Sequence, residues 1–529
     1  MAARICVVGA GASGLTATKT CLENGLQVVC FEKSSDIGGL WRYKQELYPG
    51  EGTVMKNTTI NTSKEMTAFS DFVPPPEMPN FMSHTQILAY FRSYADHFHL
   101  LQHINLRHEV LNIKKDEKYE ETGRWNVTYR IINDDVTQTE NFDGVLLCNG
   151  HHAIPYWPEQ FPGQNKFRGE IIHSQDYREP FPYRDKTVVL IGIGNSSGDI
   201  AVDLSRISKE VYLSTRSGAW VVRRTWDWSE PIDSVFISRC MHMIRKILPS
   251  WLVNRAYERK LNEYFDHGRY GLKPKHRATA QHATINDDLP GRIACGSIII
   301  KPNVARFTEH DVIFEDGTTV SNVDAVIFGT GYSFQFSIVE DGNLIPVTDN
   351  DVDLYLQMYP PQLSSKNTLA VIGLIQPVGS IMPVSEIQSR LYCEVFIGHC
   401  KLPDKNEMKK DIERKKMVLA KKFVKSRRHT LEIEYASYMD ELAEMFGAKP
   451  NLLKYLFTDP RLAFTLFFDG MAPYQFRLNG PHAWSGARDA LLGMARRTFE
   501  NSRTRRTLET MKATPINKLL YFLRMIGPF

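Results

Sequence analysis

The chain has 529 residues, of which 43% are hydrophobic and 23% are charged, and its formal net charge is +4. A chain of this length exceeds one hydrophobic core, so we expect two or more domains of ordinary globular composition. The small net charge does not favour a nucleic-acid partner. The eight cysteines are scattered without a C-x-x-C pair, which predicts neither a metal site nor a disulfide framework and favours a reducing, cytosol-facing compartment.

The first predicted element is a strand followed by a glycine-rich turn and a helix. Residues 5–8 are apolar and precede a G-x-G-x-x-G fingerprint, and a second apolar run at 28–31 ends in Glu32. In this fingerprint the glycines permit a tight turn and a close approach of pyrophosphate to the helix N-terminus. An acid about 20 residues further on accepts hydrogen bonds from ribose hydroxyls, as in FAD or NAD. We therefore assign cofactor binding to Gly9, Ala10, Gly11, Ala12, Ser13, Gly14 and Glu32.

A second strand and turn of the same kind begin at residue 187. The apolar run 187–191 precedes a second fingerprint, and the strand predicted at 211–214 ends in Thr215 and Arg216 rather than in an acid. Arginine pairs with a 2′-phosphate through charge-assisted hydrogen bonds, which predicts NADP at this site. Ser197 stands where the pattern has its third glycine, so we expect this helix to pack slightly farther from its strand. The residues assigned here are Gly192, Gly194, Asn195, Ser196, Ser197, Gly198, Thr215 and Arg216.

The remaining patterns predict that one nucleotide-binding domain is inserted in the other. Strand-like runs return at 297–301, 311–314 and 325–328, and a further run at 369–373 completes the first domain. The predicted fold class is α/β, with two doubly wound, Rossmann-like dinucleotide-binding domains and an extra, largely helical module that forms a substrate tunnel and a membrane-facing surface. The predicted parts are 1–154 and 331–445 for the FAD-binding domain, 155–216 and 296–330 for the NADP-binding domain, 217–295 for the inserted module and 446–529 for a C-terminal helical region.

Two segments have alternative interpretations that involve a membrane surface. The most apolar C-terminal stretch, 516–526, is interrupted by Lys518 and Arg524. It is too short to span a bilayer, and it either lies in the interface as a weak membrane-associating tail or docks on the protein. The basic run at 409–429 is either a solvated helix face or a surface for anionic lipid. No signal peptide is expected, because the first strand begins at residue 5.

The stretch 167–177 distinguishes among flavoenzymes. It fits F-x-G-x-x-x-H-x-x-x-(F/Y), the identifying motif of the flavin-containing monooxygenases, and the chain resembles the animal microsomal members of that family. Related Baeyer–Villiger enzymes usually place Trp where this chain has Tyr177, and the family usually has Ala where this chain has Gly329. The resemblance covers nearly the whole chain, including residues 38–41, 60–66, 150–152, 214–216, 272–276, 328–332 and 373–377.

The resemblance implies an activity and its cofactors. NADPH reduces FAD, the reduced flavin reacts with O₂, and a C4a-hydroperoxyflavin oxygenates soft nucleophiles such as tertiary amines and sulfides, as in xenobiotic N- and S-oxidation. In the family, the asparagine that matches Asn61 faces the flavin and supports this intermediate by hydrogen bonding, which suits a neutral carboxamide. The resemblance also implies a peripheral or monotopic protein of the endoplasmic reticulum membrane, and it leaves a homodimer open. Further residues that it places at the cofactors are Leu40, Trp41, Ile60, Thr62 and Gln376.

Other functions stay open beside this one. On the same scaffold, the oxygenated flavin could attack a ketone, as in a Baeyer–Villiger reaction, or release peroxide, as in an NADPH oxidase. A flavin disulfide reductase is disfavoured, because it needs a redox-active cysteine pair and Cys6, Cys21 and Cys30 have the wrong spacing. A non-catalytic nucleotide-binding protein is disfavoured too, since two intact sites of different charge preference would be superfluous to it.

A few polar residues near these motifs are secondary catalytic candidates. Histidine often serves as a general base, but a motif histidine in a linker between domains, such as His173, is more often structural. The other candidates near the site are Lys64, Glu65 and Arg223.

Overall fold

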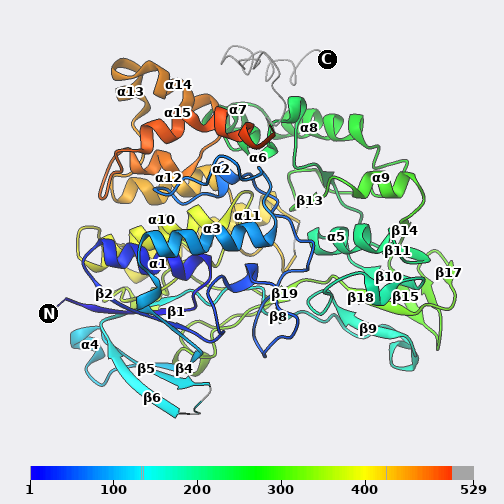
Figure 1. Cartoon of the computed structure of the whole chain (residues 1–529), viewed down its shortest axis with the longest axis horizontal. Coiled ribbons are helices and arrows are strands. Elements are labelled where there is room, and N and C mark those ends of the chain that lie inside the picture. Colours follow the sequence, from blue (N-terminus) through cyan, green and yellow to red (C-terminus); the bar gives the residue numbers. More distant parts are fainter. Residues whose placement is uncertain (1, 133, 135, 425, 503–529) are drawn as a thin grey trace.

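Two parallel five-stranded sheets lie side by side in the molecule (Figure 1). The structure is a computed structural model that describes residues 2–132, 134, 136–424 and 426–502. The first sheet has the strand order β20-β7-β1-β2-β3, and all of its neighbouring strands are parallel. Its strands are β1 (Arg4–Val8), β2 (Gln27–Glu32), β3 (Ile104–Leu106), β7 (Gly144–Leu147) and β20 (Leu369–Val371).

The second sheet has the order β14-β11-β10-β18-β9 and is also parallel. Since β20 joins the first sheet after the chain has completed the second, the second sheet is inserted within the first along the sequence. These sheets confirm the predicted α/β class with parallel, Rossmann-like sheets. The strands of the second sheet are β9 (Glu170–His173), β10 (Thr187–Ile191), β11 (Glu210–Ser214), β14 (Ile299–Lys301) and β18 (Ala325–Phe328).

The first sheet is covered on both faces, as parallel sheets usually are. Because side chains alternate along a strand, Ile5 and Val7 pack into one hydrophobic cluster and Cys6 and Val8 into another. An antiparallel sheet of β4, β5 and β6 covers the second of these faces (Figure 1). The covering elements are α1 (Ala12–Glu23), α3 (His84–His97), α10 (Ile381–Phe396), β4 (His108–Lys115), β5 (Trp125–Ile131) and β6 (Val136–Phe142).

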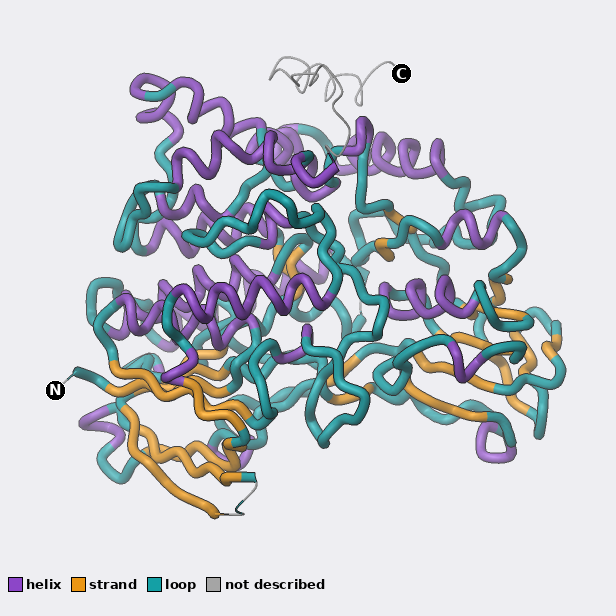
Figure 2. Tube along the Cα trace, viewed as in Figure 1, coloured by secondary structure: helices purple, strands orange, loops and turns teal. Residues whose placement is uncertain are grey.

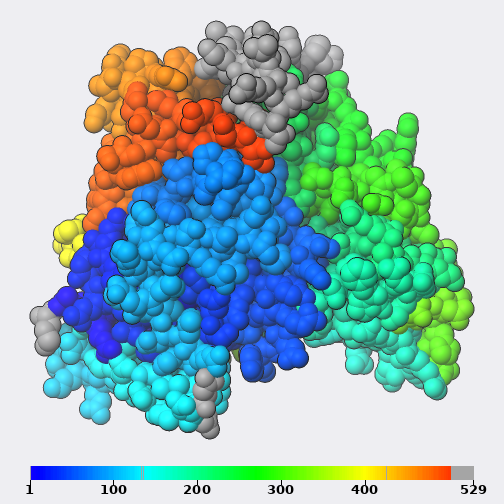
Figure 3. Space-filling view, viewed as in Figure 1, coloured from blue at the N-terminus to red at the C-terminus, as the bar shows by residue number. Residues whose placement is uncertain are grey.

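The inserted module and the C-terminal region lie at the same end of the molecule (Figures 1 and 3). In the described part of the chain, no helix is both long enough and apolar enough to cross a membrane. The predicted tail at 516–526 lies outside the described residues. The elements are β12 (Val221–Val222), α6 (Ile232–Phe236), α7 (Arg239–Ile247), α8 (Ser250–Tyr264), β13 (Thr284–Ile285) and α9 (Leu289–Ala294), then α13 (Leu452–Thr458), α14 (Pro460–Phe468) and α15 (Ala487–Thr498).

Long loops run between the two sheets, as Figure 2 shows. The remaining α-helices of the described residues are α2 (Lys64–Thr67), α4 (Tyr119–Thr122), α5 (Asn195–Leu204), α11 (Lys405–Lys422) and α12 (Tyr435–Met445). The remaining strands are β8 (Ile154–Pro155), β15 (Val304–Phe307), β16 (Val312–Phe314), β17 (Thr319–Val320), β19 (Tyr332–Ser333), β21 (Gln376–Pro377) and β22 (Glu432–Ile433).

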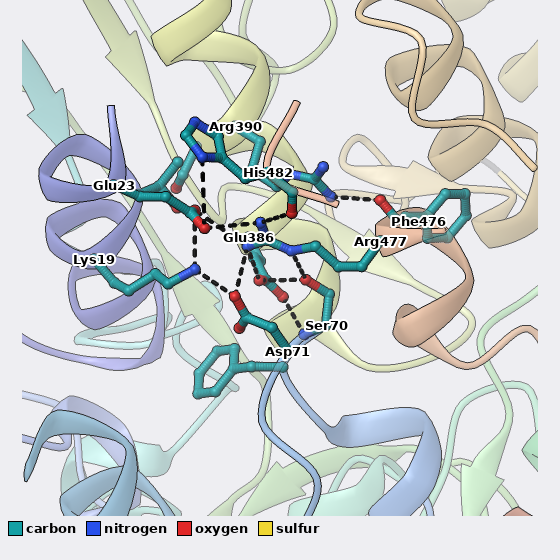
Figure 4. Close-up of polar contacts among 12 residues, drawn as sticks. Lys19, Glu23, Ser70, Asp71, Glu386, Arg390, Phe476, Arg477 and His482 are labelled. Atoms are coloured by element: carbon teal, nitrogen blue, oxygen red, sulfur yellow. Dashed lines mark hydrogen bonds and ion pairs between the residues drawn. The ribbon is translucent and has the colours of Figure 1, made fainter. Parts of the chain in front are cut away.

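A buried ion network fastens the C-terminal region to the helices of the first sheet (Figure 4). The fully buried Arg477 pairs with Glu23 of α1, Glu386 of α10 and Asp71. Burial raises the pKa of Asp71, but Arg477 and Lys19 together bring that pKa below its ordinary value. Removing one partner would leave a buried charge uncompensated, so the network fixes these elements in one arrangement.

Candidate active site

One cavity of about 2180 Å³ reaches both glycine-rich turns. Small-molecule pockets usually measure roughly 300–1,000 Å³, so this cavity has room for more than one ligand. It extends from the carboxyl ends of β1 and β10, where open α/β sheets bind ligands, to the inserted module and the segment between α11 and α12. The two fingerprints predicted from the sequence therefore share one space.

Most of the residues assigned from the sequence line this cavity. Ala10, Gly14 and Gly198 are buried and do not line it. The assigned residues that line it are Gly9, Gly11, Ala12, Ser13, Glu32, Leu40, Trp41, Ile60, Asn61, Thr62, Gly192, Gly194, Asn195, Ser196, Ser197, Thr215, Arg216 and Gln376.

The first turn requires glycine for reasons of space and backbone conformation. Gly9 has a φ of +98°, and a Cβ there would lie 2.8 Å from the carbonyl oxygen of Cys148. A Cβ on Gly14 would lie 1.7 Å from the carbonyl oxygen of Gly9. These two glycines let α1 pack closely against β1. The helix N-terminus then faces the cavity, where backbone N–H groups attract an anion.

Glu32 ends β2 beside this turn and is 7% exposed. Its carboxylate accepts hydrogen bonds from the backbone N–H groups of Ala10, at 2.7 Å, and Ser34, at 2.8 Å. Each carboxylate oxygen can accept more than one hydrogen bond, so the side chain keeps acceptor capacity toward the cavity that it lines. A buried acid in this position suits a ribose diol and would repel a 2′-phosphate.

The second turn keeps the first glycine but not the third. Gly192 has a φ of +101° and approaches the carbonyl oxygen of Gly329 as Gly9 approaches that of Cys148. The Ser197 side chain is fully buried, and a Cβ on Gly329 would lie 1.7 Å from its hydroxyl oxygen. Ser197 therefore fits because residue 329 has no side chain.

The strand after the second turn is followed by a neutral and a basic residue. Arg216 is exposed and lines the cavity, while Thr215 is buried and its hydroxyl oxygen accepts a hydrogen bond from the N–H of Gly218 at 3.1 Å. Asn195, the first residue of α5, accepts a hydrogen bond from the N–H of Ile285 at 2.8 Å. That bond ties the inserted module to the helix end that faces the cavity.

Asn61 lies in the loop before α2 with its carboxamide oxygen buried. Among the described residues, this oxygen has no hydrogen-bond partner. Leaving a buried polar atom unpaired costs roughly 1–3 kcal/mol, so a bound ligand that supplies a donor would complete the site. The neighbouring backbone is fixed, since the Ile60 N–H donates to Met82 at 2.9 Å and the Ile60 carbonyl accepts from Arg224 at 3.3 Å.

Asp233 holds the same loop from the inserted module, and no sequence motif identifies it. Asp233 lines the cavity, and its carboxylate accepts hydrogen bonds from the N–H groups of Ser63, at 2.6 Å, and Ser234, at 2.9 Å. Burial raises the pKa of Asp233 to about 6. Only the fold reveals its position, because it lies 170 residues from Ser63.

The motif at 167–177 contains β9, an edge strand of the second sheet. A Cβ on Gly169 would meet the Phe167 ring, at 2.5 Å for the nearest carbon. His173 ends the edge strand β9, is fully buried and accepts a hydrogen bond on Nδ1 from the N–H of Gln175 at 3.1 Å. Burial lowers the pKa of His173. Neither His173 nor Tyr177 lines the cavity, which agrees with a structural role for the histidine.

The other secondary candidates also lie outside the cavity wall. Lys64 donates to two backbone carbonyls at 2.6 and 2.7 Å. Glu65 forms a buried ion pair with Arg497 at 2.7 Å. The guanidinium of Arg223 lies 3.5 Å from the ring centre of Tyr264. Each of these side chains is thus engaged in packing or pairing.

Comparisons with known proteins agree with this geometry. A family model described as flavin-binding monooxygenase-like matches residues 2–526. Flavin-containing monooxygenase 5 of Rattus norvegicus is 48% identical over 490 residues, which cover 92% of this chain and 91% of that protein. Dimethylaniline monooxygenase (N-oxide-forming) 2 of Oryctolagus cuniculus is 42% identical over 528 residues, covering 100% and 98%. The S-allyl-L-cysteine S-oxygenase from Allium sativum shares the fold, with a TM-score of 0.65 at 22% identity over 94% of this chain and 99% of that one.

Proposed function

The chain belongs to the flavin-binding monooxygenase-like family and is a flavin monooxygenase, and on that premise we propose that it uses FAD, NADPH and O₂ to oxygenate soft nucleophiles. One observation carries this proposal: a single cavity reaches both the turn beside Glu32, at the end of β2, and the turn beside Arg216, after the end of β11. The acid suits the free ribose diol of FAD, and the arginine suits the 2′-phosphate of NADP.

The residues around the cavity fit both cofactors. The glycine-rich turn after β1, with Glu32, Leu40 and Trp41, would hold FAD. The turn after β10, with Thr215 and Arg216, would hold NADP(H). When bound, the two cofactors supply hydride transfer and the reductive activation of O₂. In the overall reaction NADPH, a proton, O₂ and the substrate give NADP⁺, water and the oxygenated substrate.

The chain's own contribution is to bind, orient and exclude water. Asn61 would accept a hydrogen bond from the bound cofactors on its otherwise unpaired carboxamide oxygen. Asp233 would keep the Asn61 loop in place through the N–H of Ser63. A site closed in this way would favour oxygen transfer to the substrate over the release of peroxide.

The substrate class is tested with purified, FAD-containing enzyme, NADPH and isotope-labelled O₂. We expect a tertiary amine and a thioether to give the labelled N-oxide and S-oxide, measured by mass spectrometry, with product formed in proportion to the NADPH consumed. A labelled ester from a ketone, with no amine or sulfide product, would instead establish a Baeyer–Villiger enzyme. Peroxide alone would establish an oxidase.

The role of Asn61 is tested by the fate of the NADPH that is consumed. Asn61→Ser should raise several-fold the fraction that ends as hydrogen peroxide, because a shorter side chain cannot place the same acceptor at the cofactors. The exposed Asn105→Ser is the matched control and should leave that fraction unchanged. An unchanged peroxide fraction in Asn61→Ser would remove Asn61 from the mechanism.

The arrangement of the cysteines supports a monooxygenase over a disulfide reductase. All of the cysteines lie in the described part of the chain, and Cys148 is the one that lines the cavity. Cys21 and Cys393 lie 3.7 Å apart between α1 and α10, but both are fully buried away from it. A flavin disulfide reductase needs two cysteines at its flavin, and this cavity offers no such pair.

We propose further that one end of the molecule meets a membrane surface. Large apolar side chains are exposed there, including Ile247, 70% exposed, and Trp251, 58% exposed, at α7 and α8. Leu453, 71% exposed, and Phe457, 83% exposed, come from α13. These helices lie at the same end of the molecule (Figure 1). Exposed apolar side chains gathered at one end are typical of an interaction surface.

This surface is tested by flotation of the protein with vesicles of anionic phospholipid. Replacing Ile247, Trp251, Leu453 and Phe457 by Ser should lower the bound fraction several-fold. The matched control replaces four exposed apolar residues at other places by Ser, namely Tyr48, Leu101, Val136 and Phe181. Equal flotation of the two variants would contradict the proposed surface.

A further inference from the structure

Arg428 places a cation at the second glycine-rich turn. Its Nη2 atom lies 3.1 Å from the point at which a Cβ on Gly194 would stand. Gly194 is the N-cap of α5, and both residues line the cavity. Arg428 comes from the segment between α11 and α12, whereas α5 packs on the second sheet through Ile200 and Leu204. The segment between α11 and α12 and the helix on the second sheet therefore meet at this arginine.

At this contact the exposed Arg428 adds its positive charge to that of a helix end. The N-terminus of a helix carries a partial positive charge, and a guanidinium beside it adds a full one. Within the described residues, the Arg428 side chain has no hydrogen-bond or ion-pair partner, although the Arg428 backbone N–H donates to the Ser426 hydroxyl at 3.2 Å. The acid that acts on Arg428 electrostatically is Glu432, which is fully buried and lies 3.2 Å from the His282 ring without contacting the guanidinium. An anion between Arg428 and the helix end would resolve this repulsion.

The backbone that carries Arg428 is fixed by its neighbours. The guanidinium of Arg427 lies 4.0 Å from the ring centre of Tyr156 and donates to the Ser333 hydroxyl at 3.1 Å. The Thr430 hydroxyl donates to a backbone carbonyl at 2.6 Å. With anchors on both sides, the backbone at Arg428 is held near the turn, which reduces the backbone entropy lost on binding an anion.

We propose that Arg428 binds the pyrophosphate of the nicotinamide dinucleotide at the N-terminus of α5. This inference rests on the proposed NADP site and deepens it, since it gives the phosphates two arginines with separate tasks. Arg216 contacts the 2′-phosphate, which only NADP carries. Arg428 contacts the pyrophosphate, which NADP and NAD share, and it reaches across from the half of the chain that forms the first sheet.

The basic residues of the run at 409–429 have at least two different environments. As a whole, this run suggested a solvated helix face or a lipid-binding surface. Lys409, on the exposed side of α11, fits the solvated face. Arg428, near the other end of the run, lines the cavity.

The test is equilibrium binding of NADP⁺ and NAD⁺ to the oxidised, FAD-containing enzyme, measured by calorimetry. Arg428→Ala should weaken both ligands by a similar factor of roughly 10 to 100, as expected for a lost hydrogen bond to a charged group. Arg216→Ala should weaken NADP⁺ alone. Lys409→Ala removes the same charge from the surface and should change neither affinity.

The salt dependence of NAD⁺ binding separates a phosphate contact from a merely structural effect. It should be shallower for Arg428→Ala than for the wild type, because one fewer charge pair is screened. Arg428→Lys should recover part of the affinity. Flavin content and the thermal midpoint report on folding, and Arg428→Gln replaces the alanine variant if either differs from the wild type.

The possible failures are distinguishable. If the wild type binds neither dinucleotide, the proposed function itself fails. If the wild type binds NADP⁺ and Arg428→Ala binds both ligands equally well, the inference about Arg428 is wrong. If Arg428→Ala loses NADP⁺ but not NAD⁺, the arginine contacts the 2′-phosphate, and its assignment to the pyrophosphate is wrong.

Discussion

The two glycine-rich turns share a backbone plan but distribute their side chains differently. Each begins with a glycine of positive φ, +98° at Gly9 and +101° at Gly192. In each turn this glycine lies against the carbonyl oxygen of the residue that follows the neighbouring strand, which is Cys148 in the first sheet and Gly329 in the second. Since the backbone plan is the same, the differences between the turns lie in volume and charge.

The difference in volume lies in two positions, the third fingerprint position on the helix and the residue that follows the neighbouring strand. In the first turn the helix position is Gly14 and the strand end is Cys148, which has a side chain. In the second turn the helix position is Ser197 and the strand end is Gly329. Ser197 in place of Gly and Gly329 in place of Ala are both departures from the usual pattern, and they compensate because a Cβ on Gly329 would collide with the Ser197 hydroxyl. In the first turn the obstacle to a side chain on the helix is instead the Gly9 carbonyl oxygen, while the Cys148 Cβ would lie at an ordinary contact distance of 3.6 Å.

The largest expected effect comes from adding that side chain to the first turn. Gly14→Ser would place a Cβ 1.7 Å from the Gly9 carbonyl oxygen, so α1 must move away from β1. We expect loss of bound flavin, measured as the flavin-to-protein ratio after purification, and a destabilisation of several kcal/mol (~3 or more). The control is Gly291→Ser on α9, where nothing lies within 4 Å of the new Cβ. Normal flavin content in Gly14→Ser would show that the first turn can widen as freely as the second.

The charge difference predicts the next effect. Glu32→Gln replaces a carboxylate that accepts from two backbone N–H groups by an amide that can satisfy one of them. The dissociation constant for FAD should rise roughly 10- to 100-fold, while affinity for NADP⁺ in the flavin-loaded protein should stay within about two-fold. Fluorescence titration of the flavin-free protein measures the first quantity, and the exposed Glu46→Gln serves as the control. An unchanged FAD affinity would mean that Glu32 serves the turn alone.

The proposed compensation between Ser197 and Gly329 is tested by a double-mutant cycle. Gly329→Ala alone overpacks the site and should cost about 1–3 kcal/mol of unfolding free energy. Ser197→Gly alone should cost about 1 kcal/mol through lost contacts and helix propensity. The double variant should be more stable than the sum of the two effects by at least about 1 kcal/mol. Additive costs in denaturant unfolding would show that the two departures from the pattern are unrelated.

Features carried by a continuous stretch of sequence could be predicted. The strands at 5–8 and 187–191, the turns after them and the opposite charges at Glu32 and Arg216 all follow from local patterns. A turn fixes its own backbone within a few residues, so its sequence is enough to identify it. Parallel pairing then brings the ends of the strands to one edge of each sheet.

Features made by distant segments could not be predicted. Asp233 and Arg428 come from an insertion and a loop whose approach to the cavity depends on packing rather than on any motif. Arg477 gave no sequence signal either, since a charged residue is usually exposed, yet here it is fully buried among acids from two other helices. The Ser197–Gly329 contact joins two departures from the pattern that the sequence presents separately.

The last expected effect, which appears only at acidic pH, concerns a charge on the second helix that the first helix lacks. Two residues after the third fingerprint position, α1 has the buried Thr16 and α5 has Asp199, which accepts from the Asn286 amide at 2.7 Å. Burial raises the pKa of Asp199 to about 6. Between about pH 4 and pH 6 the folded protein therefore binds more protons at Asp199 than the unfolded chain does. The stability that this group contributes is complete at the low end of that window and is lost as the pH rises through it.

Asp199→Asn should remove this pH dependence. The difference in unfolding free energy between wild type and variant should then fall by up to roughly 2 kcal/mol as the pH rises from about 4 to about 6, since one pKa unit is worth about 1.4 kcal/mol. Denaturant unfolding at several pH values measures it. Thr16→Val, which alters the matching position without a titratable group, should differ from wild type by the same amount at every pH. If Asp199→Asn also gave a constant difference, burial would not be controlling the charge of the second helix, and the contrast between the two turns would reduce to volume and to the residues at the strand ends.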